Sequence, residues 1–211
     1  YGTETFKESV KLFMDYGEQS SLDALKNLPK GTFHGEDLLD NGKKIQVDVT
    51  ITDSEFLVDL RNNPGGYLQQ VFEIADMFLD EGLILIEERK DGEIIWEAQQ
   101  GGVAVDVPLV LIVNRYSASG SEILMGAFQD NLRAKVVGER SFGKGTVNVF
   151  RELSNGGGLY MSIGRWYTPK RRIIEGDGLE PDYEVTSKDT QKADVMQIEK
   201  ATEILNTLIS K

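Results

Sequence analysis

The chain has 211 residues, and 40% of them are hydrophobic, so it can bury a substantial core and is not globally disordered. Its formal net charge of −12 argues against nucleic acid as a partner, because phosphate binding needs clustered lysine and arginine. Cysteine is absent and His34 is the one histidine, which excludes thiol nucleophiles, disulfides and multi-histidine metal centres. We read His34, in a polar stretch, as a solvated loop residue, so any hydrolysis is expected to use another base.

The apolar runs are too short to span a bilayer, the longest being residues 107–113. The chain begins at Tyr1 rather than at a methionine, which indicates a processed or truncated piece of a longer protein. A chain without cysteine also suits an oxidising compartment as well as the cytosol.

The first elements expected are helices over residues 5–16 and 21–28. Strict alternation predicts a half-buried strand at 44–51, and a more buried strand at 56–60 leads into a glycine-rich turn. Apolar residues at helical spacing predict a helix over 67–82 that ends at a glycine. The later elements expected are a hairpin about 90–92, a buried strand at 107–113, a helix at 119–131, strands at 134–139, 146–153, 157–164 and 171–176, and an amphipathic helix at 193–209.

Strands and helices alternate through the middle of the chain, and the last third is mostly strand. This order predicts an α/β core with additional β elements. A polar stretch near residue 52 suggests a boundary. We therefore expect an N-terminal helical and strand segment over 1–55, partly unrecognised, and a core over 56–211.

A serine-rich segment, residues 114–122, directly follows the buried strand and opens a helix. Small residues at such a turn leave a serine hydroxyl exposed, and N–H groups at the helix start face an anion. The segment therefore suits a nucleophile with half of an oxyanion hole. It equally suits an ordinary helix start whose serines cap the first N–H groups.

A second segment, residues 138–146, nearly matches the phosphate-binding pattern GxxxxGK[ST]. Gly145 follows Lys144 where that pattern needs a hydroxyl residue, and a strand-like stretch follows where it needs a helix. Nucleotide binding is therefore not expected, and Lys144 is either a solvated turn lysine or a base. A third segment ends in Gly65 and Gly66, whose N–H groups fit either a tight turn or the other half of an oxyanion hole.

Taken together, the three segments favour a hydrolase. A serine needs a base to act as a nucleophile at neutral pH, and a lysine can serve if burial lowers its pKa from about 10.4. Ser–Lys pairs are an accepted variant of the serine hydrolase arrangement, and each oxyanion donor contributes about 3–4 kcal/mol. All three segments follow predicted strands.

The same segments resemble the C-terminal processing peptidases, also called tail-specific proteases. That resemblance implies a crotonase-like α/β core, with Ser119 as nucleophile and Lys144 as general base. The matching stretches are 57–66, 113–131, 136–148, 165–173 and 176–182, followed by a helix like the family's closing helix at 194–205.

The resemblance also assigns supporting roles. Asp130 is implied as a supporting residue, and Gly65 or Gly66 with the Gly120 N–H as the oxyanion hole. The family often has a glutamine that orients the lysine where this chain has Asn148, which is one methylene shorter, so that contact is expected to be longer or lost.

What the resemblance implies is an endopeptidase that cleaves unfolded or extended polypeptides near their C-terminus, without a metal or cofactor. Such enzymes work outside the cytoplasm, which suggests the bacterial periplasm or cell envelope rather than the thylakoid lumen. A membrane anchor outside this fragment and a homo-oligomer are both compatible with it. Family members usually carry a PDZ domain, and residues 1–56 show no carboxylate-binding loop of that kind. The alternative is a catalytically silent relative that binds polypeptide tails or scaffolds an assembly.

Overall fold

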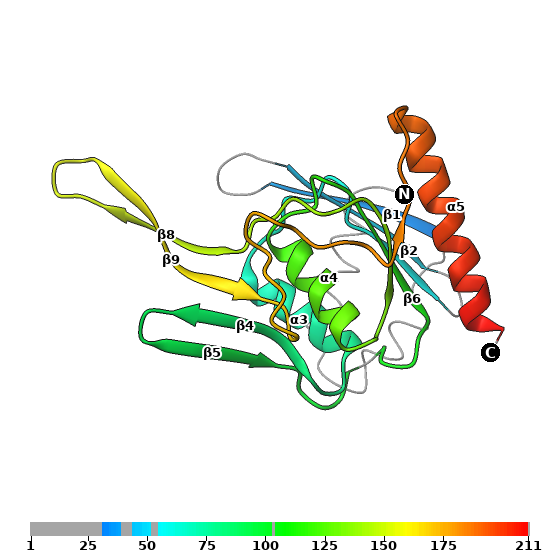
Figure 1. Ribbon diagram of the computed structural model, residues 1–211, viewed down its shortest axis with the longest axis horizontal. Helices are drawn as coiled ribbons and strands as arrows, with labels where there is room; N and C mark the ends of the chain where they lie inside the picture. The colour runs from blue at the N-terminus through cyan, green and yellow to red at the C-terminus, as the bar shows by residue number, and fades with distance from the viewer. Residues whose placement is uncertain (1–30, 39–43, 52–54, 103, 211) are drawn as a thin grey trace.

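The computed structural model describes residues 31–38, 44–51, 55–102 and 104–210. The helices expected over 5–16 and 21–28 lie outside the described residues. The described part contains two sheets and three helices, α3 to α5 (Figure 1).

The larger sheet has six strands in the order β1-β2-β3-β6-β7-β10. Its central strands β3, β6 and β7 run parallel, and β10 joins β7 in the same direction. The carboxyl ends of the three central strands therefore meet at one edge, which is where α/β sheets bind ligands. The strands are β1 (Gly31–Leu38), β2 (Lys44–Ile51), β3 (Phe56–Asp59), β6 (Leu109–Val113), β7 (Lys135–Gly138) and β10 (Tyr183–Glu184).

Helices α3 (Leu68–Phe78) and α4 (Gly120–Asp130) cover one face of this sheet, and α5 (Thr190–Ile209) covers the other (Figure 1). Alternate residues of β6 enter two separate apolar clusters, one beneath α3 and α4 and one beneath α5. Both faces of β6 are thus buried, which explains why its sequence is an uninterrupted apolar run.

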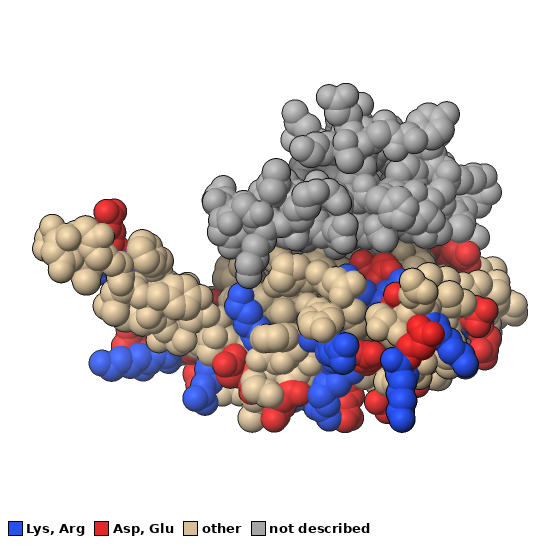
Figure 2. All heavy atoms as spheres, turned by 90° about the horizontal axis from the view of Figure 1, so that it is seen from above, with Lys and Arg blue, Asp and Glu red and all other residues tan. Residues whose placement is uncertain are grey.

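The smaller sheet is antiparallel, in the order β5-β4-β9-β8. Its strands are β4 (Leu83–Arg89), β5 (Gly92–Glu97), β8 (Thr146–Glu152) and β9 (Gly158–Tyr167). The hairpin of β8 and β9 projects from the body as an arm (Figures 1 and 2). Figure 2 also shows acidic and basic side chains interleaved on the described part of the surface that faces the viewer.

Most expected elements are confirmed, including the strand at 44–51, the hairpin about 90–92 and the helix at 119–131. Three expectations about extent or register are wrong. The helix expected over 67–82 already ends at Phe78, and the strand expected at 171–176 is reduced to a single bridge between Tyr167 and Ile173. In the C-terminal helix the apolar residues Val195 and Ile198 are 55% and 44% exposed, so the buried face is narrower than the amphipathic pattern indicates.

The loop reading of His34 is also wrong, because His34 lies in β1 opposite Asp48 of β2. Strands β1 and β2 add in series to β3, so one sheet crosses the boundary expected near residue 55. The division at that residue stays a prediction. None of the described helices is long and apolar enough to cross a membrane.

Candidate active site

Three loops follow the carboxyl ends of β3, β6 and β7, and hydrogen bonds tie them together. The Ser117 hydroxyl donates to the Leu60 carbonyl at 2.8 Å. The Ser121 hydroxyl and the Ala118 N–H both donate to the Asn63 carbonyl at 3.0 Å. Ser117 and Ser121 therefore link the loops to one another. Ser119, at the N-cap of α4, forms a capping box with Glu122, so for this serine the capping alternative stands.

Ser119 occupies the N-cap position of α4 with φ 55° and ψ −114°. A positive φ is rare for a residue with a Cβ and persists only where the surroundings enforce it. Two hydrogen bonds of the buried Ser119 backbone hold this conformation. The N–H donates to Glu122 Oε2 at 2.9 Å, and the carbonyl accepts from the Ile123 N–H at 3.0 Å. Ser119 therefore lies at a sharp strand-to-helix turn, but it is only 8% exposed, so the exposed hydroxyl expected from the sequence is wrong for this structure.

Two backbone N–H groups lie beside Ser119 without an acceptor among the described residues, those of Gly66 and Gly120. A Cβ on Gly120 would lie 3.2 Å from the Gly66 nitrogen, so the two donors are neighbours. The Gly65 N–H, in contrast, donates to Asn63 Oδ1 at 2.8 Å. Of the two glycines that the sequence left open, Gly66 is therefore the one whose N–H has no acceptor among the described residues.

Gly65 is needed for a different reason. Its φ is +86°, and a Cβ there would lie 2.5 Å from the Gly120 nitrogen and 2.8 Å from the Ser119 Cβ. Only a glycine lets the β3 loop approach Ser119 this closely.

A buried carboxylate, that of Glu122, joins the serine turn to the lysine turn. Its Oε2 accepts the N–H groups of Ser119 at 2.9 Å and Lys144 at 2.8 Å. Its Oε1 accepts the Ser141 hydroxyl at 2.6 Å and the Gly143 N–H at 2.7 Å. The residue is 0% exposed, and four hydrogen bonds offset the cost of burying its charge. Sequence reasoning did not single out Glu122, although an acidic residue three positions after a serine N-cap is a known capping signal.

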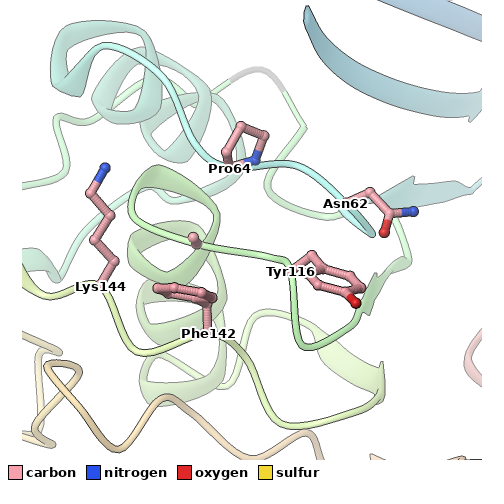
Figure 3. A pocket seen from close by; sticks show the side chains of 6 residues that line it. Asn62, Pro64, Tyr116, Phe142 and Lys144 are labelled. Carbon is pink, nitrogen blue, oxygen red and sulfur yellow. The ribbon is translucent and has the colours of Figure 1, made fainter. Parts of the chain in front are cut away.

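The Lys144 side chain lines a pocket of about 640 Å³ (Figure 3). In that view it lies across the pocket from Tyr116, with Phe142 between them and Pro64 on the opposite wall. The remaining lining residues are Asn62 and Ala118, the latter being the neighbour of Ser119. Lys144 is exposed, so the burial expected for this lysine is not present. The sequence could not reveal this, because exposure depends on what the pocket contains.

Among the described residues, the hydrogen bonds of the Asn148 amide go to Thr146 and Ser162 and not to Lys144. The amide Nδ2 donates to the Thr146 hydroxyl at 3.1 Å, and the Oδ1 accepts the Ser162 hydroxyl at 2.7 Å across the β8–β9 hairpin. A register shift between Val147 and Asn148 accompanies this arrangement. The lysine-orienting role of Asn148 stays a prediction that this structure does not support.

Asp130 lies at the far end of α4, ~16 Å along the axis from Ser119 at 1.5 Å per residue. Its Oδ2 accepts the Lys170 N–H at 2.8 Å, and its Oδ1 pairs with Arg172 at 2.7 Å. Asp130 therefore stabilises the turn after β9 and lies far from Ser119.

The family model described as peptidase family S41 matches residues 45–185. The chain belongs to peptidase family S41. A second family model, hydantoinase B/oxoprolinase, matches residues 1–69, about a third of the chain and largely outside the described residues.

Curated relatives of this S41 chain include the carboxyl-terminal-processing protease of Synechocystis, 43% identical over 127 residues, which are 60% of this chain and 30% of that protein. The chloroplastic carboxyl-terminal-processing peptidase 1 of Arabidopsis thaliana is 40% identical over 136 residues, 62% of this chain and 27% of that protein. The chain therefore spans under a third of the length of these relatives.

Among solved structures, the photosystem II D1 C-terminal processing protease is similar with a TM-score of 0.59 and 33% identity, covering 67% of this chain and 38% of that one. A lipoprotein from Streptococcus agalactiae shares the fold at 16% identity, with a TM-score of 0.54 over 93% of this chain and 88% of that one. The mixed α/β architecture is thus that of S41 structures.

Two further clusters hold the S41 site loops in place. Ser141 accepts the Leu179 N–H on its hydroxyl at 2.7 Å, and the Glu175 carboxylate accepts the Gly145 N–H at 2.7 Å. The segment about 176–182, which the sequence singled out, is therefore a support for the lysine turn.

Arg61 holds the β3 loop in place in a similar way. Its guanidinium binds Asp59 through Nε at 2.9 Å and reaches Asp194 of α5 at 3.0 Å and Gln197 at 3.2 Å. The described residues contain no group of three acidic or histidine side chains that could hold a metal ion.

Proposed function

We propose that this S41 chain is a serine endopeptidase that cleaves polypeptides near their C-terminus, with Ser119 as nucleophile and Lys144 as general base. One observation carries the proposal: the Glu122 carboxylate binds the backbone N–H groups of both residues. A single buried group thus positions the two turns that a Ser–Lys hydrolase needs. The printed names of the relatives support cleavage at carboxyl-terminal regions.

In the proposed reaction, the neutral amine of Lys144 takes the proton of the Ser119 hydroxyl while Oγ attacks the peptide carbonyl carbon. The charge on the carbonyl oxygen is stabilised by the N–H groups of Gly66 and Gly120. The lysine then passes its proton to the leaving amine, and the C–N bond breaks to leave an acyl-enzyme. A water molecule, deprotonated by the same amine, hydrolyses that ester and restores Ser119.

The exposure of Lys144 gives the substrate a part in this chemistry. A polypeptide lying in the pocket would exclude water from the amine, and loss of solvent disfavours the charged form of a lysine. The nucleophile and the oxyanion donors are in place without substrate, whereas the environment of the base is completed by it.

The finer features of the sequence hypothesis belong to this proposal. The core is of the crotonase-like type, the substrate binds as an extended strand held by main-chain hydrogen bonds, and no organic cofactor takes part. The protein acts outside the cytoplasm, in the bacterial periplasm or cell envelope, and a homo-oligomer is compatible with this proposal. Residues 56–211 form the catalytic core.

The test is mass spectrometry of an unfolded polypeptide incubated with wild type and with Ser119→Ala. Wild type is expected to generate new peptide termini, and Ser119→Ala none. Lys144→Ala is expected to be inactive too, and Lys144→Arg not to restore cleavage, because a guanidinium stays protonated near neutral pH. Full activity in any of these variants would contradict the proposal.

A silent relative that binds polypeptide tails is the second candidate. It is favoured by the exposed Lys144 side chain and by the Asn148 amide, which is bonded within its own hairpin. Tight binding of unfolded chains by wild type, with no product formed, would select this candidate.

A further inference from the structure

The arm formed by β8 and β9 is exposed along its whole outer part, because every residue from 150 to 162 is exposed. The stretch contains one positive and one negative side chain, so it is neutral in a chain of net charge −12. In Figure 2 the arm is accordingly a largely tan projection. Its large hydrophobic side chains are 39% to 69% exposed, and they are Phe150, Leu153, Leu159, Tyr160 and Met161.

The arm also has an unpaired edge. Among the described strands, β8 pairs with β9 alone, and β9 pairs with β4 only through residues 164–167. Edge strands are commonly protected by lysine, proline or a bulge. Residues 146–163 contain neither lysine nor proline, and the one register shift, between Val147 and Asn148, lies at the base of the arm. The outer edge of β8 is therefore open to another strand.

One face of the arm is aromatic. Phe150 lies opposite Tyr160 in the ladder, so both side chains are on the same face. A Cβ at Gly158 would overlap the Phe150 ring, which shows that this ring lies against Gly158 across the hairpin. The Leu153 N–H donates to the Gly157 carbonyl at 2.7 Å and closes the tip. A two-stranded hairpin alone is only marginally stable in water, so this uncovered face favours a partner.

We propose that the arm is a dimerisation surface, in which β8 pairs antiparallel with β8 of a second copy of this chain about a two-fold axis. The result is one four-stranded sheet in the order β9-β8-β8-β9. A two-fold interface uses the same patch on both copies, so the patch must be complementary to itself.

The sequence of β8 meets that requirement in one register. A two-fold axis through an antiparallel pair makes one residue face its own copy. An axis at Arg151 or at Glu152 would bring like charges together, which destabilises a sheet. An axis at Phe150 places Val149 opposite Arg151 of the second copy, so no like charges meet. Phe150 and Tyr160 of both copies then form one aromatic row across the sheet.

Charge also favours the arm as the point of contact. Two chains of net charge −12 repel each other over most of their surfaces, whereas the arm is neutral. Antiparallel pairing keeps the two bodies at opposite ends of a shared sheet whose β8 strands, of seven residues each, are about 20 Å long. Each copy contributes fewer exposed residues than the roughly 20–30 of a standard interface, so we expect a dissociation constant of about 10 μM.

Sedimentation velocity of the 211-residue chain over a range of about 1 to 200 μM measures the association. Wild type is expected to pass from monomer to dimer within this range. Phe150→Glu and Phe150→Arg are each expected to dimerise at least about tenfold more weakly, because like charges then face each other at the axis. An equimolar mixture of the two variants is expected to recover at least about fivefold in affinity, because opposite charges then meet there.

Val195→Glu is the matched control, since Val195 is 55% exposed on α5, outside the arm. It is expected to dimerise as wild type does, and circular dichroism checks that every variant keeps its fold. Three results would each overturn the inference: a wild type that stays monomeric throughout, a dimer that Phe150→Glu leaves intact, or a mixture that associates no better than its components. No substrate is present in the measurement, so its outcome is independent of the proposed function.

Discussion

The serine half and the lysine half of the site are built differently. Ser119 is 8% exposed, has a constrained backbone and stands beside two oriented N–H donors. Lys144 has an equally fixed backbone, but its side chain is exposed in an open pocket. Under the proposed mechanism, this difference means that Ser119 and the neighbouring N–H donors are preorganised by the fold, whereas the surroundings of Lys144 are completed by the substrate. Preorganised donors contribute most when they need no rearrangement during the reaction.

Glu122 is the link between the halves, so its replacement should have the largest effect. Glu122→Gln replaces an acceptor oxygen by an NH₂ group that faces two donors, which leaves buried groups unpaired. We expect a loss of about 2–4 kcal/mol in unfolding free energy and a fall in kcat/KM of about a hundredfold or more. Urea unfolding and peptide cleavage measure the two effects.

The control for that change is Glu97→Gln, at an exposed position on β5, which should alter unfolding free energy by less than about 0.5 kcal/mol. If Glu122→Gln left the unfolding free energy unchanged and kcat/KM within twofold of wild type, the two halves would not depend on a shared carboxylate.

Gly65→Ala tests the serine half alone. The new methyl group would meet the Gly120 nitrogen at 2.5 Å, so one oxyanion donor must move. We expect kcat to fall by about a hundredfold or more, in line with the loss of an oxyanion donor. The measurement is kcat on a short peptide.

Gly156→Ala is the matched control, because Gly156 has a similar φ of +80° but open space around its Cβ position. It carries the same backbone strain, of about 1–2 kcal/mol, without the clash. Equal losses of kcat in both variants would mean that backbone strain, and not the close approach, explains the effect of Gly65→Ala.

The smallest expected effect concerns the ion pair between Arg171 and Glu93, away from the candidate site. A hydrogen bond from Arg171 lowers the pKa of the Glu93 carboxyl, and the attraction between the two charges acts in the same direction. A lowered pKa contributes stability above the unfolded-state value and loses it as the pH falls through the folded-state value. The melting temperatures of wild type and Glu93→Gln should therefore differ slightly near pH 7 and converge below about pH 4. A difference that grows at low pH would contradict this sign.

Much of the α/β core could be predicted because its signals are local. The apolar run of β6, the alternation of β2 and the glycines that end elements each identify one segment. The β1 strand was missed because its sequence is polar and its pairing with β2 is a tertiary fact. In α5, Gln197 is buried with its amide bonded to Arg61 and to the Val185 carbonyl, and no helical periodicity predicts a buried glutamine.

The residues of the candidate site stand out in the sequence to different degrees for the same reason. Ser119 and Lys144 stand in short segments with recognisable chemistry, so sequence alone brings them forward. Glu122 looks like a helix cap until four donors from two loops are seen around it. The Asn148 contact with Ser162 depends on hairpin register, which a sequence motif does not specify.

The most direct test of the central claim is detection of the acyl-enzyme. Wild type is mixed with an activated ester of a short apolar acyl peptide, quenched in acid and analysed by intact and peptide-level mass spectrometry. We predict one acyl adduct, located on Ser119, absent in Ser119→Ala and formed at least about a hundredfold more slowly in Lys144→Ala. An adduct on another residue, or an unchanged rate in Lys144→Ala, would contradict the assignment of nucleophile and base.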